Sequence, residues 1–519
     1  MNITYDWLFG AFVRTDEKLL KECSDLYSNH YGKWSDNAPN NAGKNIKLSP
    51  NRLLDWLKND ASAIYLARDN NDLVGYAIAL RLKVRRYGIV SWVTQLVVHE
   101  KYRHKDIAKT ILYSIWGFSD DFAWGIISAN PYAVRALEKA TRRRSDPVRI
   151  KKNEKKIVSI GISNVSYMNV SYMKKERKHF VSKEVSKINT EFYVDHSDID
   201  SMIENVSSGG VPWKLGKLEE GWEWLAFTFR DQIQIELNES ELNKIFEASD
   251  RVVQNAYKRM DLTNNHQWLK NTDYEVNFIL QECELSENDV VIDFGCGIGR
   301  HAIRLAQKGI HVHGIDYIEK NIEVADKKKA ENAIQNAAFY ADDCRTKKLN
   351  TVKADAIICL YDVIGTYADN NENYKILKNI YEHLKIGGIA LISVMNFELT
   401  NFKAKHRFSL KSDPNELLNI KPGNIMETTG NIFDPNFYWI EDDTKIVYRR
   451  EQFKRGTSLP VELFVRDKRF TKNEIIEMCE TIGFEIMYTR YVNARDWETG
   501  FLPTNDSAKE ILVKCRRVR

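Results

Sequence analysis

Apolar and polar positions recur with two different periods in the first 180 residues, and these periods predict a mixed α/β domain. Two runs with strand character, 63–68 and 74–82, flank the turn-forming segment Asn70-Asn71-Asp72, so a β-hairpin is expected there. A third strand is expected over 90–98. Apolar residues at helical spacing then predict a helix over 105–118. The predicted order is hairpin, strand, helix.

Residues 181–240 have a mixed pattern that does not define a separate core. We treat them as a connecting segment, either independent or part of the first domain. The aromatic-rich stretch 219–229 is interpreted as a core strand and turn, and the alternative is a stacking platform for nucleic-acid bases.

The pattern changes to alternating strands and helices in the remainder of the chain. Helices are expected over 241–281, followed by an apolar strand over 290–294. A Gly-rich loop and a helix over 300–308, which Gly309 ends, separate this strand from a second one over 310–315. Strand, helix, strand in this order indicates a doubly wound parallel sheet.

Composition agrees with a globular protein of two or three domains. The 519 residues are 43% hydrophobic and 29% charged. The apolar runs are shorter than the roughly 18 residues that a membrane span needs, and the N-terminus does not resemble a secretory signal. Seven cysteines without a C-x-x-C pair argue against disulfides and against a structural metal. A cytoplasmic location is therefore expected.

The net charge of +4 is unevenly distributed along the chain. Residues 142–183 contain 13 Lys and Arg against three acidic residues, so this segment carries a charge of +10. A basic stripe of this kind can bind phosphate or an acidic partner, although a solvated connector is the commoner explanation.

The loop Gly295-Cys-Gly-Ile-Gly299 has the features of a nucleotide-binding element. Its glycines allow a tight turn close to a ligand, and the amides at the start of the next helix point toward that ligand. Asp316, at the end of the second strand, is placed to accept hydrogen bonds from ribose hydroxyls. A nicotinamide dinucleotide site is the nearest alternative, but its G-x-G-x-x-G spacing differs from the spacing here.

Residues 293–299 resemble motif I of the class I S-adenosylmethionine-dependent methyltransferases. The resemblance continues through 354–362, similar to the fourth strand of the family, through 383–388, similar to the turn before its fifth strand, and through 470–484, similar to its last helix and strand. In the last of these, Thr471 and Glu474 predict a capping box. The resemblance implies a Rossmann-like sheet and the following S-adenosylmethionine-binding residues: Asp293, Gly295, Gly297, Gly299, Asp316, Asp343 or its neighbour Asp342, and Leu360.

The methyl acceptor is less well defined. The N-P-P-Y tetrapeptide of amino-methylating nucleic-acid enzymes is absent from the fourth strand, which favours the small-molecule branch of the family. In that branch helices before motif I, here 257–268, fold over the cofactor, and the insertion 396–464 covers the acceptor. Candidate acceptor-pocket residues are Tyr361, Asp362 and Tyr367, and no catalytic group is identified. Positioning alone can be sufficient for methyl transfer.

Residues 91–108 and 128–138 resemble motifs A and B of the GCN5-related N-acetyltransferases (GNAT). The resemblance implies acetyl-CoA binding by Leu96, Val98, Arg103, Ala108 and Asn130. In the pyrophosphate motif Q/R-x-x-G-x-G/A, however, Asp106 replaces the middle glycine. The tyrosine that often acts as general acid aligns with Leu137, and Tyr132 is offset from that position.

The sequence therefore predicts an acetyltransferase-like domain over 1–180, the connecting segment 181–240, and a methyltransferase domain over 241–519. The leading hypothesis is a bifunctional enzyme that methylates a small molecule and that also acetylates through its N-terminal domain. One alternative is modification of tRNA or DNA, with the basic stripe 142–183 as the binding surface. The other is a degenerate, non-catalytic N-terminal module.

Overall fold

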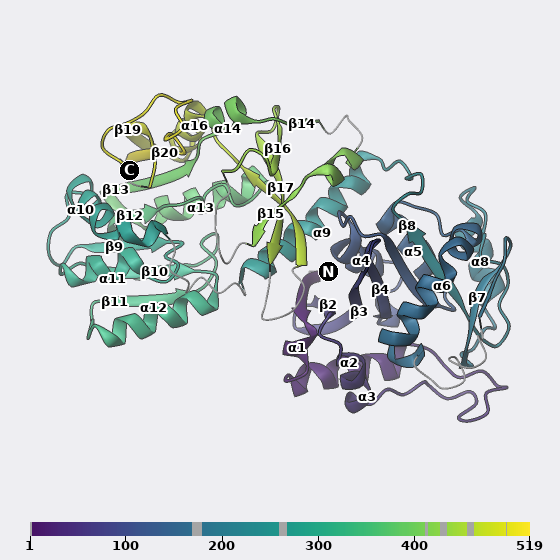
Figure 1. Ribbon diagram of the computed structural model, residues 1–519. Coiled ribbons are helices and arrows are strands. Elements are labelled where there is room, and N and C mark those ends of the chain that lie inside the picture. Colours follow the sequence, from purple (N-terminus) through teal and green to yellow (C-terminus); the bar gives the residue numbers. More distant parts are fainter. Residues whose placement is uncertain are drawn as a thin grey trace. The chain divides into compact units, whose positions relative to one another are not determined.

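The computed structural model describes residues 3–168, 179–258, 267–409, 414–425, 433–453, 461–494 and 496–519. The chain divides into two compact units, and the second begins at Val253, within helix α9 (Glu239–Lys258). Both units contain a mixed or parallel sheet with helices, so the predicted α/β class is confirmed (Figure 1). No helix among the described residues is long and apolar enough to cross a membrane.

The first unit is built on an eight-stranded mixed sheet in the order β1-β2-β3-β4-β5-β8-β7-β6. Neighbouring strands are antiparallel except for β4 and β5, which are parallel. The strands are β1 (Ile3–Phe9), β2 (Ser62–Asp69), β3 (Asp72–Val84), β4 (Gly88–Val98), β5 (Ala123–Ser128), β6 (His179–Val181), β7 (Ser186–Phe192) and β8 (Gly221–Phe229). Residues 179–229 thus contribute three strands to this sheet, and the aromatic-rich stretch 219–229 contains the core strand that we expected.

The helices of the first unit lie both before and after the predicted hairpin and strand. They are α1 (Gly10–Val13), α2 (Glu17–His30), α3 (Pro50–Trp56), η1 (Glu100–Tyr102), α4 (Ile107–Trp116), α5 (Pro131–Thr141), α6 (Pro147–Asn164), η2 (Ser166–Met168) and α8 (Ile199–Ser207). Side chains of α2 and α3 pack with those of β2, β3 and β4 in one core.

A β-bulge at Thr94 lies where the pairing of β4 with β5 ends. Gln95 is paired with Ile78 of β3, whereas Val93 is paired with Ala79, so Thr94 is an additional residue in β4. Pairing of β4 with β5 ends at Val93, although β4 continues to Val98. The two strands therefore part at their carboxyl ends.

The second unit contains a seven-stranded sheet in the order β11-β10-β9-β12-β13-β20-β19. The first five are parallel, and β20 runs antiparallel to both of its neighbours. The strands are β9 (Val290–Phe294), β10 (His311–Asp316), β11 (Ala337–Ala341), β12 (Ala354–Cys359), β13 (Leu384–Met395), β19 (Phe484–Val492) and β20 (Glu510–Arg517). The chain order reverses beside β9, which is the switch point expected of a doubly wound sheet.

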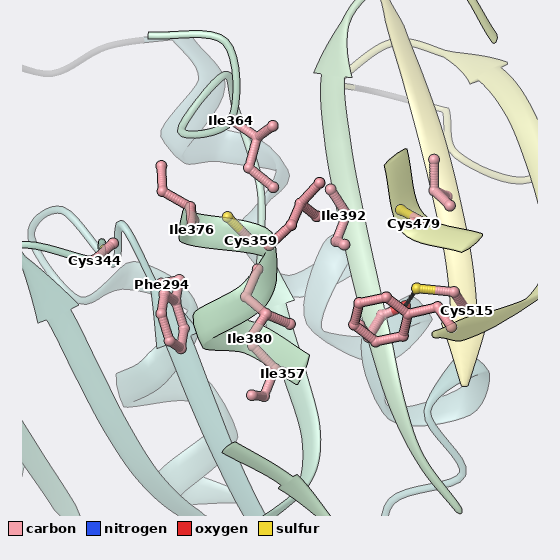
Figure 2. Close-up of a cluster of buried hydrophobic side chains, with 14 of the residues drawn as sticks. Phe294, Cys344, Ile357, Cys359, Ile364, Ile376, Ile380, Ile392, Cys479 and Cys515 are labelled. Carbon is pink, nitrogen blue, oxygen red and sulfur yellow. Dashed lines mark hydrogen bonds between the residues drawn. The ribbon is translucent and has the colours of Figure 1, made fainter. Parts of the chain in front are cut away.

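Helices cover both faces of this sheet. On one face, α13 and α16 pack against a core that includes Phe294, Ile357, Ile376 and Ile392 (Figure 2). On the other face, α10 and α11 pack against Val291, Ile358 and their neighbours. The helices of this unit are η3 (Gln267–Asn271), α10 (Thr272–Glu282), α11 (Arg300–Gln307), α12 (Glu319–Glu331), α13 (Asn370–His383), α14 (Phe397–Lys403), η4 (Pro414–Asn419) and α16 (Lys472–Ile482).

The predicted insertion forms a small separate sheet. Its strands are β14 (Arg407–Phe408), β15 (Pro422–Ile425), β16 (Tyr438–Glu441), β17 (Ile446–Phe453) and β18 (Val461–Lys468). The Lys468 amide donates to the Gly365 carbonyl at 2.8 Å, which joins β18 to the loop after β12. Parts of the predicted insertion and most of the predicted lid, at residues 259–266, lie outside the described residues.

The helix signals predicted within 470–484 were confirmed, whereas the turn predicted at 383–388 was wrong. Thr471 and Glu474 form the predicted capping box, and Gly483 ends α16 with a φ of 115°. Residues 383–388 do not form a separate turn, because β13 begins at Leu384, directly after α13. A register irregularity opposite Ala354 and Ala356 absorbs the Gly387-Gly388 pair within the strand.

Gly295 and Gly297 offer a matched test of the Gly-rich loop. A Cβ at Gly295 would lie 2.2 Å from Cγ2 of Val363, whereas a Cβ at Gly297 would meet no atom within 4 Å. Both residues have positive φ. We expect Gly295→Ala to lower the free energy of unfolding by roughly 2 to 5 kcal/mol, and Gly297→Ala by about 1 to 2 kcal/mol, because only the first adds overpacking to backbone strain.

Urea unfolding of the two variants measures this difference. Adding Val363→Ala to Gly295→Ala should recover part of the loss. Equal losses for the two alanine variants would show that contact with Val363 does not constrain the loop.

Candidate cofactor sites

The Gly-rich loop of the second unit is held by backbone hydrogen bonds and has one open position. The amides of Gly295 and Cys296 both donate to the Ile315 carbonyl, at 2.8 and 3.0 Å. A Cβ at Gly299 would lie 2.9 Å from that of Ala325, so this glycine is required for packing against α12. Gly297 instead faces open space. The loop therefore has room for a ligand at Gly297.

Asp316 connects the loop to the second strand. One of its carboxylate oxygens accepts the Gly297 amide and the other accepts the Ile318 amide, both at 2.9 Å. Burial raises the pKa of Asp316, and these two amides act in the opposite direction. The Asn321 side-chain amide also donates to Oδ1, at 3.4 Å, so Oδ2 is the oxygen that keeps a lone pair for a ribose hydroxyl.

Asp293 ends β9 directly before the loop and is 2% exposed. Its Oδ2 atom is buried without a hydrogen-bond partner. Burial raises the pKa of Asp293 to about 7, and the charge on Arg300 partly opposes this rise. An unpaired buried carboxylate oxygen is unfavourable unless a cation or a donor from a ligand completes it.

The two other predicted acids lie after β11, beside β10 and the Asp316 end of the sheet. The Asp342 carboxylate accepts the Asp343 amide and pairs with Lys347 at 3.0 Å. Asp343 pairs with Arg345 at 2.6 Å, and although burial opposes ionisation, this pairing lowers the pKa of Asp343. The structure thus brings Asp293, the glycines, Asp316, Asp342 and Asp343 to the same edge of the sheet. Leu360 follows β12 at that edge and is buried.

Tyr361 is tied to a buried carboxylate that the sequence did not indicate. Its hydroxyl hydrogen-bonds to Glu275 of α10, which is fully buried. Glu275 also pairs with Arg300 at 2.5 Å and with His301 at 2.7 Å. Burial lowers the pKa of His301 to about 4, so this imidazole is neutral. Tyr361 has a φ of 63°, and the network holds it in this unusual conformation.

Asp362 is directed toward charged residues of the insertion. Burial and the nearby Asp467 carboxylate raise its pKa well above the usual range, and its Oδ1 atom is buried without a partner. Asp467 of β18 pairs with Arg449 of β17 at 2.8 Å, and Arg449 pairs with Glu451 at 3.1 Å. Buried charged groups of β17 and β18 therefore act on Asp362, which follows β12.

Tyr367 lies beside the acids after β11, because the Arg345 guanidinium stacks over its ring at 4.4 Å. The three candidate acceptor-pocket residues, Tyr361, Asp362 and Tyr367, thus contact three different sets of groups. Their role in binding an acceptor stays a prediction.

The first unit contains a cavity of about 1050 Å³ where β4 and β5 part. All five residues predicted to bind acetyl-CoA line it: Leu96, Val98, Arg103, Ala108 and Asn130. Asn130 also caps α5, accepting the Tyr132 amide at 2.9 Å. Tyr132 lines the same cavity, whereas Leu137 is in the core.

Asp106 keeps the backbone conformation that glycine would supply at this position. It is the N-cap of α4 with a φ of 62°, in the left-handed region. Its carboxylate pairs with Lys109 at 2.8 Å and with Lys244 at 3.6 Å. Burial alone would raise the pKa of Asp106, but these lysines lower it overall. The negative charge that the sequence placed beside a diphosphate is therefore neutralised by two cations.

Two further cavity residues were missed by sequence analysis. Gln95 accepts a hydrogen bond from the Tyr76 hydroxyl at 2.9 Å, and its Nε2 atom is buried without a partner. Burial raises the pKa of Glu223, on β8, to about 7. A β-bulge cannot be seen in the pattern of 90–98, and Glu223 belongs to a strand far along the chain, so only the fold brings the two together.

Several cations of the basic stripe 142–183 are engaged within the first unit. Arg143 is 2% exposed and stacks over Trp124 at 4.7 Å. Arg144 pairs with Glu138, and Lys156 lies over the Tyr87 ring at 3.7 Å. Residues 169–178 of the stripe lie outside the described ranges.

Comparison with known proteins finds a family match in each of the two units. Residues 285–449 match the family model of the methyltransferase domain, and residues 27–140 match that of the GNAT acetyltransferase family. The ubiquinone biosynthesis O-methyltransferase of Rickettsia typhi is 28% identical over 27% of this chain and 59% of its own length. The phosphoethanolamine N-methyltransferase of Plasmodium falciparum is 33% identical over 22% of this chain and 42% of its own.

The chain spans about three fifths of the length of the first of these relatives. A solved S-adenosylmethionine-dependent methyltransferase from Clostridium acetobutylicum is 14% identical, with a TM-score of 0.35, and covers 53% of this chain and 98% of its own. The two family matches, on separate parts of the chain, confirm both resemblances that the sequence motifs indicated. The chain therefore joins a domain of the GNAT acetyltransferase family to a methyltransferase domain.

Proposed function

We propose that the second unit binds S-adenosylmethionine and transfers its methyl group to a small-molecule acceptor. The observation that carries this proposal is the unpaired Oδ2 of Asp293, at the end of β9, together with the open position at Gly297 in the loop that follows. S-adenosylmethionine has an α-ammonium group that can pair with this carboxylate and a ribose whose hydroxyls can donate to Asp316. The buried acids thus suit a cationic cofactor.

The cofactor supplies a methyl group already activated on a sulfonium, so the contribution of the protein is to position the acceptor. The edge formed by Asp293 and Asp316 holds the donor. The end of β12, where Asp362 meets Arg449 and Asp467, is our proposed acceptor side. Polar groups that lack partners there, including Oδ1 of Asp362, support an acceptor that forms hydrogen bonds.

The names of the relatives include both an O-methyltransferase and an N-methyltransferase. Both names agree with a small-molecule acceptor, and we propose a hydroxyl or an amine as the methylated group. The engagement of Arg143, Arg144 and Lys156 within the first unit gives no support to the nucleic-acid alternative.

We propose as a second function that the first unit binds acyl-CoA. The supporting observation is the 1050 Å³ cavity, which all five predicted residues line, together with the left-handed backbone at Asp106. Amides at the N-terminus of α4 can bind the diphosphate. A bifunctional enzyme that acts in the reducing environment of the cytoplasm fits the seven cysteines, all of which are buried and free.

Asp293→Asn tests the first proposal. The unbound carboxyl has a pKa of about 7, well above that of an unfolded chain, so near neutral pH it is partly protonated. Pairing with the ammonium of S-adenosylmethionine favours the charged form and should release part of a proton between about pH 6 and pH 7. Titration calorimetry in buffers of different ionisation enthalpy measures this release.

In Asp293→Asn the proton release should be smaller, and affinity should fall about tenfold or more because a charge-assisted hydrogen bond is lost. Asp289→Asn, a conservative change at a half-buried residue directly before the same strand, is the control and should bind as wild type does. Unchanged affinity and unchanged proton release in Asp293→Asn would reject this placement of the cofactor.

Asp106→Asn tests the second proposal. Asparagine tolerates left-handed backbone, and its neutral side chain leaves Lys109 and Lys244 available to a diphosphate. We expect coenzyme A to bind about three to ten times more tightly at low salt, with a smaller gain at high salt. Asp120→Asn removes the same charge outside the cavity lining and should have no effect. Weaker binding by Asp106→Asn would place the diphosphate elsewhere.

A further inference from the structure

Glu510 brings a second buried carboxyl group to the proposed acceptor side of the second unit. It is the first residue of β20, which runs antiparallel to β13, so it lies at the edge where the parallel strands end. The Ser393 hydroxyl hydrogen-bonds the Glu510 carboxylate and also accepts the Tyr361 amide, at 2.8 Å. Ser393 therefore connects Glu510 to the segment Tyr361-Asp362 that follows β12.

Both carboxyl groups keep one oxygen without a partner. Glu510 is 5% exposed, and its Oε2 atom has no hydrogen-bond partner among the described residues. Asp362 is half-buried, yet its unpaired Oδ1 atom is shielded from water. Tyr361 and Asp362 have φ values of 63° and 67°, which non-glycine residues rarely adopt. Unpaired acceptors beside a strained segment are unfavourable for folding, and a ligand that donates to them would offset this cost.

Arg449 adds an unpaired donor to the same region. It is 6% exposed, its Nη2 atom pairs with Asp467 at 2.8 Å, and its Nε atom lies 3.1 Å from Glu451. Its Nη1 atom is buried and has no hydrogen-bond partner in the part of the chain that the structure describes. The charges of Arg449 and Asp362 act on each other, so the guanidinium lies near the Asp362 carboxyl group. The acceptor side thus offers one donor as well as two acceptors.

Negative charge exceeds positive charge among the buried groups that act on Asp362 and on its neighbours. Four carboxyl groups face two guanidinium groups: Asp362, Glu451, Asp467 and Glu510 against Arg449 and Arg469. Glu275 and Arg300 also act on Glu510 but pair with each other, and Lys509 acts on it from an exposed position. Burial raises the pKa of Glu510 to about 7, and burial with the Asp467 charge raises that of Asp362. A cationic ligand would offset the excess.

We propose that Asp362 and Glu510 bind the protonated nitrogen of a primary or secondary amine and that Nη1 of Arg449 donates to a hydroxyl of the same molecule, so that the methyl acceptor is an amino alcohol. The inference rests on the proposed methyl transfer by this unit. An ammonium group brings several N–H donors and a positive charge, whereas a hydroxyl brings one donor and no charge. A carboxylate or phosphate on the acceptor would increase the excess of negative charge.

The bound ammonium has to lose one proton before its nitrogen can form a bond to the methyl carbon. Oε2 of Glu510 takes this proton. The nitrogen then bonds to the methyl carbon as the carbon–sulfur bond breaks, and the electron pair of the broken bond stays on sulfur, which becomes neutral. The methylated nitrogen is positively charged again, and Glu510 releases its proton to the solvent.

Asp362→Asn and Glu510→Gln distinguish a role in binding from a purely structural one. Each variant removes one negative charge from a region that has too many, so the midpoint of urea unfolding at pH 8 should be unchanged or higher. The affinity for the amino alcohol should nevertheless fall about tenfold or more, because a charge-assisted hydrogen bond is lost. Asp443→Asn, in the exposed turn between β16 and β17, is the matched control and should change neither quantity.

The acceptor is identified with the full-length protein, methyl-labelled S-adenosylmethionine and a library of amino alcohols. Each amino alcohol is matched by the plain amine, the diol and the amino acid of the same carbon skeleton. We expect methylation on nitrogen, with the amino alcohol bound about tenfold more tightly than the plain amine because of Arg449. Titration calorimetry on protein saturated with S-adenosylhomocysteine measures this binding without turnover.

The outcomes separate this inference from the proposed function. A wild type that binds neither S-adenosylmethionine nor S-adenosylhomocysteine would overturn the proposed function itself. Cofactor binding without binding of any amine, or methylation of the diols alone, would overturn the assignment of the acceptor. Lower unfolding midpoints in both variants with undiminished amine affinity would show that Asp362 and Glu510 have only a structural role.

Discussion

The second unit depends on one fully buried carboxylate, that of Glu275. A buried charge is stable only when it is paired, and Glu275 is paired with Arg300 and His301 of α11 and with the hydroxyl of Tyr361. Arg300 directly follows the last glycine of the Gly-rich loop, and Tyr361 lies two residues after the end of β12. One side chain of α10 therefore sets the position of the two segments between which a donor and an acceptor would meet.

Most elements that position this site could be predicted from the sequence, because they are signalled locally. The apolar run before Asp293, the glycines, Asp316 and the capping box at Thr471 all lie within short segments whose residue types have a direct backbone consequence. Glu275 could not be predicted in this way. Its partners are 25 to 86 residues distant along the chain. The sequence of α10 therefore does not indicate that Glu275 is buried, because the residues that pair with it come from other segments.

In the N-terminal cavity, too, some residues could be predicted from local motifs and others could not. Arg103 and Asn130, from the two predicted motifs, both line the cavity, and each motif could be found because it is contiguous in sequence; acetyl-CoA binding by these residues stays a prediction. The segment after residue 180 had no clear signal, yet it supplies β6, β7 and β8, and with them Glu223. The residue that departs from the motif, Asp106, is compatible with the loop because its partners, Lys109 and Lys244, come from α4 and α9.

The bulge at Thr94 also changes which face of the sheet the side chains of β4 occupy. Side chains alternate along a strand, so Val93 and Gln95 would normally face the same side; the extra residue places them on opposite sides, since their partners Ala79 and Ile78 are adjacent in β3. The alternation of side chains along β4 thus restarts at Gln95, directly after the extra residue. One extra residue in β4 therefore coincides with the point at which β4 and β5 stop pairing, so the cavity begins where the strand departs from regular geometry.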